Sequence, residues 1–195
     1  MKYQSVQLEI TSRDWVGESK YCQAVSEKNR IQRTVFARLC QVTEENFDHS
    51  IFLDEFIVQS NCNASRIWYQ PFPDEDRLGI IGRYKHLQSV HCIGAISRLG
   101  PTSLLLFTGK LNAPGFQDAC DHILVPFIEN NFPDYHQLHM DNARPHTAVS
   151  TEAYLDDKNI FHFKTPAQSP DLNPIELVWH DLKVYIAEQV KQKIF

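Results

Sequence analysis

An acidic pair interrupts one of the most apolar stretches of the chain. Asp54 and Glu55 lie within IFLDEFIVQ at 51–59, whose β-branched and aromatic residues predict a strand. An unpaired buried carboxylate is costly, and this run contains no Lys or Arg, so a divalent cation would offset that cost directly. Because successive strand residues point to opposite faces, only one of the two can reach a given site. The alternative is an edge strand whose acids face water.

A second carboxylate, Asp141, stands where a predicted short strand ends, in HMDNARPH. Ligand sites of α/β folds lie beyond the carboxyl ends of strands, which makes Asp141 a candidate metal ligand. Asn142 and His146 follow closely enough to line the same cleft. The alternative is a structural Asp that starts a turn or caps the next helix.

The third candidate is Glu176, in SPDLNPIELVW. Asn173 suits the N-cap of a helix, Pro174 suits the first helical position, and Glu176 is then three residues beyond the cap, as in a capping box. Capping alone would therefore explain this Glu. Capping and metal binding are compatible, because a first-turn carboxylate can point outward from the start of a helix.

Taken together, the three carboxylates predict a metal-dependent phosphodiester chemistry. Mg²⁺ takes oxygen ligands, keeps several waters and binds substrate phosphate. A two-metal site needs carboxylates from different elements that converge on ions about 4 Å apart. Two strand-borne Asp residues and one helix-borne Glu, namely Asp54, Asp141 and Glu176, meet that requirement.

The elements that must position these residues follow from periodicity and turn residues. We predict, in order, a helix at 20–45, strands at 51–59, 66–69, 89–97 and 103–108, a helix at 115–130, a strand at 135–140, a helix at 147–158, a strand at 160–164 and a helix from 174 to near the end. Antiparallel strands followed by strand–helix alternation are typical of an RNase H-like fold. This is an α/β fold with a mixed sheet flanked by helices.

The first predicted helix carries an apolar stripe and a basic face. The stripe consists of Val25, Ile31, Val35, Leu39 and Val42, and the opposite face of Lys28, Arg30, Arg33 and Arg38. The basic face is either solvated or directed at DNA, and Arg30, Arg33 and Arg38 are the candidate DNA contacts. We therefore divide the chain into a linker remnant with a basic amphipathic helix at 1–45 and a catalytic domain at 46–195.

The composition is globular but acidic. The chain has 43% hydrophobic residues and 24 acidic against 19 basic residues, a net charge of −5. Phosphate binding relies mainly on Lys and Arg, so this balance predicts that the basic residues are clustered or that the main DNA-gripping part lies elsewhere. The scattered cysteines predict buried free thiols rather than disulfides. No apolar run is long enough to span a membrane, and no membrane partner is expected.

Five motifs resemble the catalytic domain of Tc/mariner-type transposases, over about residues 20–190. They are FLDE at 52–55, GAISRLG at 94–100, LFTGKLNA at 106–113, DNARPHTA at 141–148 and PAQSPDLNPIELVW at 166–179. Between Asp141 and Glu176 lie 34 residues, the spacing of one large branch of that family. The last motif with this spacing is the most specific part of the resemblance.

The resemblance implies a fold, an activity and partners. Family members cut the ends of their own element and join the freed 3′-hydroxyls to a TA target, using Mg²⁺ or Mn²⁺. It implies that Asp54, Asp141 and Glu176 hold two such ions, and that Asn142, His146 and Asn173 support them. It also implies DNA ends and a TA target as partners, with a homodimer and a nuclear location as further expectations.

The chain also departs from the family pattern. Ile93 stands where the family has an aromatic residue, and Met140 where a polar residue usually precedes the second Asp. An acidic insertion, Asp74-Glu75-Asp76, stands where basic character would be expected. We expect a missing helix-turn-helix region before this domain and a truncated C-terminus.

Several other residues could suggest different sites. His136, His139 and His162 suggest zinc, but strand geometry directs His136 away from the face shared by His139 and Asp141. Trp68 and Tyr69 could stack on an unpaired base, although core packing is the more common role of such a pair. Trp179 is interpreted as a core residue.

Three functions remain open on the sequence. The first is a metal-dependent DNA transposase. The second is an inactive or co-opted remnant that binds nucleic acid without catalysis, and the third is an RNase H-like nuclease of unrelated purpose. The intact carboxylate triad favours the first, whereas the expected loss of the helix-turn-helix region favours the second.

Overall fold

The structure is a computed structural model that describes residues 25–59 and 89–194. Some of our predictions fall outside the described residues: the linker at 1–19, the strand at 66–69, the aromatic pair Trp68 and Tyr69, and the acidic insertion at 74–76. The described residues contain no helix long and apolar enough to cross a membrane.

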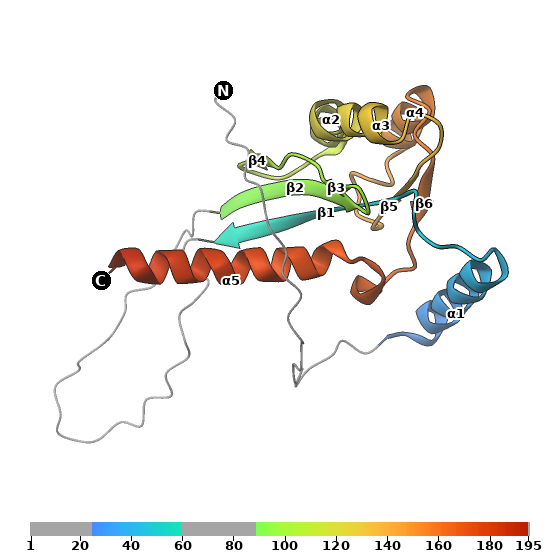
Figure 1. The fold of residues 1–195 in the computed structure, drawn as a ribbon, viewed down its shortest axis with the longest axis horizontal. Helices are drawn as coiled ribbons and strands as arrows, with labels where there is room; N and C mark the ends of the chain where they lie inside the picture. The colour runs from blue at the N-terminus through green and yellow to red at the C-terminus, as the bar shows by residue number, and fades with distance from the viewer. Residues whose placement is uncertain (1–24, 60–88, 195) are drawn as a thin grey trace, which may run out of the picture.

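A mixed sheet forms the centre of the molecule (Figure 1). Its strands are β1 (Ser50–Gln59), β2 (Ser89–Ser97), β3 (Gly100–Pro101), β4 (Leu105–Phe107), β5 (Gln137–Met140) and β6 (His162–Lys164). The strand order is β3-β2-β1-β5-β6, and β4 also pairs with β2. β1 runs antiparallel to β2 and parallel to β5, and β5 runs parallel to β6. The predicted mixed sheet is therefore confirmed.

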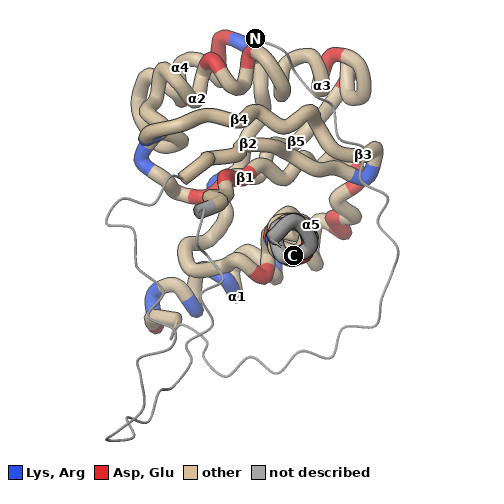
Figure 2. Tube along the Cα trace, turned by 90° about the vertical axis from the view of Figure 1, so that its left-hand side faces the viewer, with Lys and Arg blue, Asp and Glu red and all other residues tan. Residues whose placement is uncertain are grey.

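Helices cover both faces of this sheet. The helical elements are α1 (Glu27–Val42), α2 (Ala113–Ala119), a π-helical turn η1 (Cys120–Leu124), α3 (Val125–Asn131), α4 (Val149–Asp157), a 3₁₀ turn η2 (Pro170–Leu172) and α5 (Ile175–Ile194). Figure 2 shows α2, α3 and α4 on one side of the sheet and α5 on the other, with α1 on the same side as α5.

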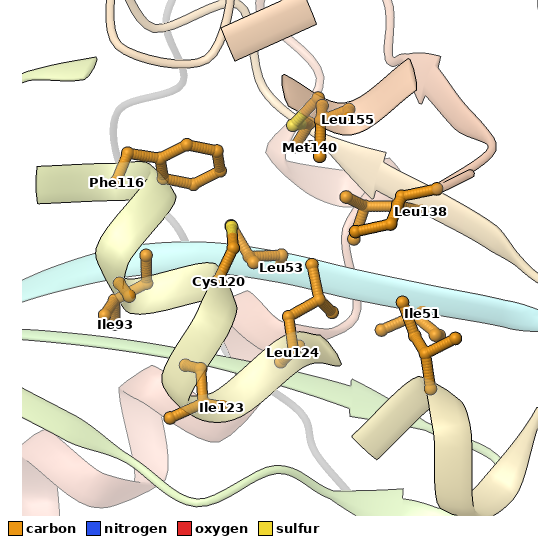
Figure 3. Close-up of a cluster of buried hydrophobic side chains, with 14 of the residues drawn as sticks. Ile51, Leu53, Ile93, Phe116, Cys120, Ile123, Leu124, Leu138, Met140 and Leu155 are labelled. Atoms are coloured by element: carbon orange, nitrogen blue, oxygen red, sulfur yellow. The ribbon is translucent and has the colours of Figure 1, made fainter. Parts of the chain in front are cut away.

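Alternation along β1 divides its side chains between two cores. Ile51 and Leu53 are fully buried against α2, η1 and α3, together with Phe116 and Leu124 (Figure 3). Each such side chain stabilises the fold by roughly 1.5–3 kcal/mol. The even-numbered Phe56 lies on the other face in a second cluster with Cys92, Ile175 and Trp179. Asp54 shares the face of Phe56, so packing of the second cluster aims it towards α5.

The segment predicted as one helix at 115–130 is helical throughout but contains the π-helical turn η1. Pro126 explains why a regular α-helix is unfavourable here, because proline has no backbone N–H and its ring clashes with the preceding turn. At the end of η1 the Val125 N–H donates to the Cys120 carbonyl, an i→i+5 bond. The wider turn accommodates the proline without ending the helical segment.

The apolar stripe of the first helix is not a core-facing stripe. Ile31, Val35 and Leu39 are each more than half exposed, and Val42 is 83% exposed. No residue of α1 is buried. The half-buried residues of α1 lie outside this stripe and are Asn29, Arg33, Phe36 and Cys40.

Smaller differences concern strand lengths and one side chain of α5. The predicted strand at 103–108 is shorter in the structure, where β4 comprises only Leu105–Phe107. Within α5 the predicted apolar side includes Val178, Leu182 and Ile186, which are partly buried, but Tyr185 is 56% exposed. Trp179 is buried, which confirms its interpretation as a core residue.

Candidate active site

The three predicted carboxylates line one cavity of about 380 Å³. The cavity lies where β1 and β5 approach the start of α5, and the segment between β6 and α5 forms one wall. Its lining residues are Asp54, Asp141, Asn142, Ala143, Thr165, Pro166, Ala167, Gln168, Ser169, Pro170, Asn173 and Glu176. The structure thus brings together residues from a strand, a strand end and a helix start that are far apart in sequence.

Asp54 is the most perturbed member of the three. It is partly buried on β1, and it pairs across the ladder with Gly94 of β2. Burial, followed by the negative charges of Glu176 and Asp141, raises the pKa of Asp54 from 3.8 to about 7. The indole of Trp179 counters a small part of that increase in pKa, although its Nε1 has no described acceptor within hydrogen-bonding distance. A metal-free site therefore tends to keep a proton on Asp54.

Asp141 follows β5 directly and is held by two donors. Its Oδ1 accepts from Nδ1 of His146 at 2.7 Å and from the backbone N–H of Ala143 at 2.9 Å. The hydrogen bond from His146 holds the pKa of Asp141 below its ordinary value of 3.8. Asp141 is thus an ionised carboxylate with a fixed orientation, next to a carboxyl that tends to be protonated.

His146 connects the two acidic segments of the site. Its ring is 2% exposed, and its Nε2 lies 3.2 Å from Oε1 of Glu55. Burial alone would lower its pKa, but the two carboxylates outweigh burial and raise the pKa of His146 to about 9. The side chain therefore acts as a buried cation between Glu55 and Asp141. Its ring also packs against Phe116, with centroids 4.4 Å apart.

The acidic pair on β1 is divided as strand alternation requires. Asp54 lines the cavity, whereas Glu55 points to the opposite face and meets His146. The prediction that only one of the two reaches the site is confirmed. The role of Glu55 was missed, because its partner His146 is 91 positions away in sequence and no local pattern connects them.

Glu176 lies in the first turn of α5, and Asn173 caps that helix in a different way from a capping box. The side chain of Asn173 accepts from the N–H of Ile175 at 3.3 Å, and its backbone carbonyl accepts from the N–H of Glu176 at 3.2 Å. Glu176 itself is exposed and faces the cavity. Asn173 therefore fixes the first turn of α5, and with it the outward direction of Glu176.

Asn142 anchors the far wall of the cavity. Its Nδ2 donates to the backbone carbonyl of Thr165 at 2.9 Å. Thr165 in turn donates its hydroxyl to the carbonyl of Met140 at 3.0 Å. The start of the segment between β6 and α5 is therefore tied to the end of β5, next to Asp141.

The carboxylates share a cavity but do not form a preassembled ion cage. Within residues 25–59 and 89–194, no group of three or more His, Cys, Asp or Glu side chains lies close enough together to hold one ion. The three carboxylates still lie near enough to interact, since each of the other two raises the pKa of Asp54. The all-oxygen donor set is nevertheless the set that Mg²⁺ and Mn²⁺ prefer.

The three histidines considered for zinc have different surroundings. His139 is buried in a stack between the rings of Phe52 and Phe163, and its Nε2 lies 3.0 Å from Oγ of Ser50. Burial lowers the pKa of His139 to about 4. His136 is also buried, and Nδ1 of His162 lies 3.3 Å from the carbonyl of Ile160.

The candidate DNA-binding arginines differ in their surroundings. Arg30 pairs with Glu27 on the surface of α1, and Arg38 is exposed. Arg33 makes a two-pronged ion pair with Asp171, at 2.7 and 2.6 Å. Its guanidinium is therefore engaged within the chain, which sequence alone could not reveal because Asp171 is 138 positions away.

Comparison with known proteins identifies the family to which the chain belongs. A family model described as "DDE superfamily endonuclease" matches residues 49–194. The chain belongs to this family. The Tc3 transposase of Caenorhabditis elegans is 30% identical over 86 residues, which is 44% of this chain and 26% of that protein. The Tcb1 transposase of Caenorhabditis briggsae is 26% identical over 95 residues, 49% of this chain and 35% of that protein.

Solved structures extend the likeness to the fold. The Mos1 transposase in a paired-end complex with the left transposon end superposes with a TM-score of 0.67 at 18% identity, covering 94% of this chain and 58% of that one. The isolated catalytic domain of the Mos1 mariner transposase gives 0.62 at 17% identity, covering 92% and 83%. The predicted RNase H-like fold and the Tc/mariner resemblance are confirmed, and this DDE chain is a transposase-type catalytic domain. It spans well under two thirds of the length of the curated relatives.

Proposed function

We propose that this DDE domain catalyses metal-dependent DNA cleavage and strand transfer in cut-and-paste transposition. The single observation that carries the proposal is the convergence of Asp54, Asp141 and Glu176 on one cavity. Chance packing does not account for this convergence, because burial of Asp54 among other acids is unfavourable without a cation.

Asp54, Asp141 and Glu176 would hold the divalent ions, Mg²⁺ or Mn²⁺, and two ions are the number that the two-metal chemistry requires. Related Mos1 structures were solved with Mg and with Mn, which supports the choice of metal. Bound ions would stabilise charge on the scissile phosphate and lower the pKa of the attacking hydroxyl. The fit rests on the oxygen donors and on the raised pKa of Asp54, which a nearby cation would bring down again.

The protein's own residues prepare the site for this chemistry. His146 keeps Asp141 ionised and oriented, since its Nδ1 donates to Oδ1 of that carboxylate. Asn142 fixes the wall at Thr165, and Asn173 fixes the first turn of α5, which carries Glu176. Asn142, His146 and Asn173 therefore have supporting roles, each through a residue that it positions.

DNA is the proposed substrate, with element ends and a TA target as in the family. Mos1 relatives were solved as complexes with transposon ends and as a strand transfer complex, which supports DNA as partner. We extend to this chain a homodimeric assembly and a nuclear location on the family resemblance. Arg30 and Arg38, whose side chains are solvent-exposed, remain candidate DNA contacts.

A plasmid-nicking assay tests the proposed activity without requiring recognition of particular ends. Supercoiled DNA is incubated with the chain and Mn²⁺, and the wild type is compared with Asp141→Ala and with Asp156→Asn, an exposed acid outside the cavity. We expect nicking by the wild type and by Asp156→Asn and none by Asp141→Ala. Equal activity of wild type and Asp141→Ala would overturn the assignment. Inactivity of all three would favour the alternative of a remnant that binds nucleic acid without catalysis.

A further inference from the structure

The helix that precedes the catalytic domain is fastened to the wall of the active-site cavity. The N-cap residue Ser26 and two residues of α1, Asn29 and Arg33, contact the segment between β6 and α5. Figure 1 shows α1 beside the short coil that precedes α5. These contacts are polar, and they continue along α1 into the half-buried Phe36 and Cys40, which line a second cavity with His139 and Phe163.

Gln168 is the centre of the contact, and it lines the cavity. Its side-chain Oε1 accepts from Nδ2 of Asn29 at 2.7 Å and from the backbone N–H of Ser26 at 3.3 Å. Its backbone carbonyl accepts from Nη1 of Arg33 at 3.2 Å. The side-chain amide and the backbone carbonyl of Gln168 are thus both bonded to the α1 segment.

The backbone of Gln168 also needs this support. Its φ is +56°, in the left-handed region that a residue with a Cβ adopts at a cost. Such a conformation persists only where surrounding contacts determine it. The bonds from Asn29 and Arg33 are the contacts that do so here, and without them a more relaxed backbone would change the shape of the cavity wall.

The second fastening point leads directly to Glu176. Arg33 binds both carboxylate oxygens of Asp171, in η2, which ends at Leu172. The next residue, Asn173, caps α5 and accepts from the N–H groups of Ile175 and Glu176. Arg33 is therefore connected to Glu176 by the ion pair with Asp171 and by the helix cap at Asn173.

We propose that α1 is a working part of the catalytic unit, in which Arg33 and Asn29 are positioning residues for Gln168 and Glu176. The segment at 165–173 is then fixed at both ends, by Asn142 at Thr165 and by α1 at Gln168 and Asp171. Displacement of α1 releases the second end, loosens the first turn of α5 and weakens the metal site. This inference rests on the proposed function for its catalytic consequence but not for the fastening itself.

Amide hydrogen exchange tests the fastening without any metal or DNA. The variants are Arg33→Ala, Arg33→Lys and, as matched control, Arg30→Ala, whose guanidinium pairs with Glu27 of the same helix. We expect Arg33→Ala to speed exchange at 168–177 by about tenfold, the factor that corresponds to loss of a charge-assisted bidentate pair. Arg33→Lys should give an intermediate increase because Lys lacks the fork, and Arg30→Ala should give none. Unchanged exchange at 168–177 in Arg33→Ala would overturn the proposal.

Mn²⁺ titration of the same variants tests the consequence for the site. Arg33→Ala and Asp171→Ala should each weaken Mn²⁺ binding several-fold, and the double variant should be no weaker than either alone, because both remove one interaction. Wild-type affinity in Arg33→Ala, despite faster exchange, would show that the fastening does not position Glu176. If the wild type itself binds no Mn²⁺, the proposed function fails, while the exchange experiment still decides whether α1 holds the wall.

Discussion

At the residue scale, the site combines carboxylates with opposite proton affinities. Burial and neighbouring negative charge raise the pKa of Asp54 to about 7, whereas the hydrogen bond from His146 keeps the pKa of Asp141 low. Groups lining one cavity whose pKa values diverge in this way are typical of functional sites. Here the divergence means that a cation must displace a proton from Asp54, so metal binding should strengthen as pH rises through about 7.

The same raised pKa makes Asp54 a source of instability at neutral pH. Between pH 3.8 and about 7 the folded chain keeps a proton on Asp54 that the unfolded chain has released. The free energy of unfolding therefore falls as pH rises across this window. We expect Asp54→Asn, without metal at pH 8, to raise the free energy of unfolding by about 1–3 kcal/mol.

Urea denaturation at two pH values measures this effect. The stabilisation by Asp54→Asn should be present at pH 8 and absent near pH 3.5, where both states of the wild type are protonated. Adding Mn²⁺ should stabilise the wild type but not the variant. A destabilised Asp54→Asn at pH 8 would contradict the account of this residue.

His146 is predicted to matter through the carboxylates it joins. His146→Phe keeps a ring against Phe116 but leaves Glu55 and Asp141 without their shared donor. We expect a loss of about 1–3 kcal/mol in unfolding free energy and a roughly 10- to 100-fold loss in Mn²⁺ affinity. Calorimetry should show neither effect for His122→Phe, a substitution of a solvent-exposed histidine outside the cavity. Normal Mn²⁺ affinity in His146→Phe would remove its positioning role.

At the element scale, the close approach of α5 to the sheet depends on a glycine next to Asp54. A Cβ at Gly94 would lie 2.5 Å from Cδ2 of Leu104 and 3.3 Å from the ring of Trp179. Leu104 can rotate, but Trp179 is buried and stacked on Phe56 with centroids 4.7 Å apart.

Gly94→Ala should therefore push α5 outward and destabilise the fold by about 1–2 kcal/mol, as over-packing of a core does. Because Glu176 lies three residues before Trp179 on α5, the variant should also weaken Mn²⁺ binding. Thermal unfolding measures the first effect, with Gly109→Ala as a comparison at a site where a Cβ has open space but the φ is +89°. A wild-type melting temperature for Gly94→Ala would show that α5 is not confined there.

The elements differ in how far sequence could predict them. The strand with Asp54 and the helix with Glu176 were predicted correctly because each combines a strong local pattern with a clear end signal. The π-helical turn before Pro126 was not, since i→i+5 and i→i+4 bonding leave nearly the same periodicity over so few residues. The stripe of α1 shows a different limit: periodicity reports an apolar face, but not whether anything covers it.

At the scale of the whole molecule, the candidate site was largely predictable and its support was not. Asp54, Asp141 and Glu176 could be chosen because chain order and spacing carry over from a recognised motif frame. Contacts such as Arg33 with Asp171 and His146 with Glu55 join residues 138 and 91 positions apart. No local pattern encodes such pairs, because they depend on how the sheet order and helix docking bring distant segments together.

The cavity carboxylates are part of the acidic character of the chain. The net charge of −5 includes the cavity carboxylates, which attract cations rather than phosphate. The basic residues of α1 are divided between an internal ion pair at Arg33 and exposed positions at Lys28, Arg30 and Arg38. DNA would then approach the carboxylates through the metal ions they hold.

The most direct test of this account is calorimetric titration of Mn²⁺ into the chain at pH 8. We predict saturable binding by the wild type, with two ions per chain. Asp54→Asn, Asp141→Asn and Glu176→Gln should each lose most of that binding, and Asp156→Asn should retain it. Wild-type binding in all three cavity variants, or no binding by the wild type, would contradict the claim that these carboxylates form the metal site.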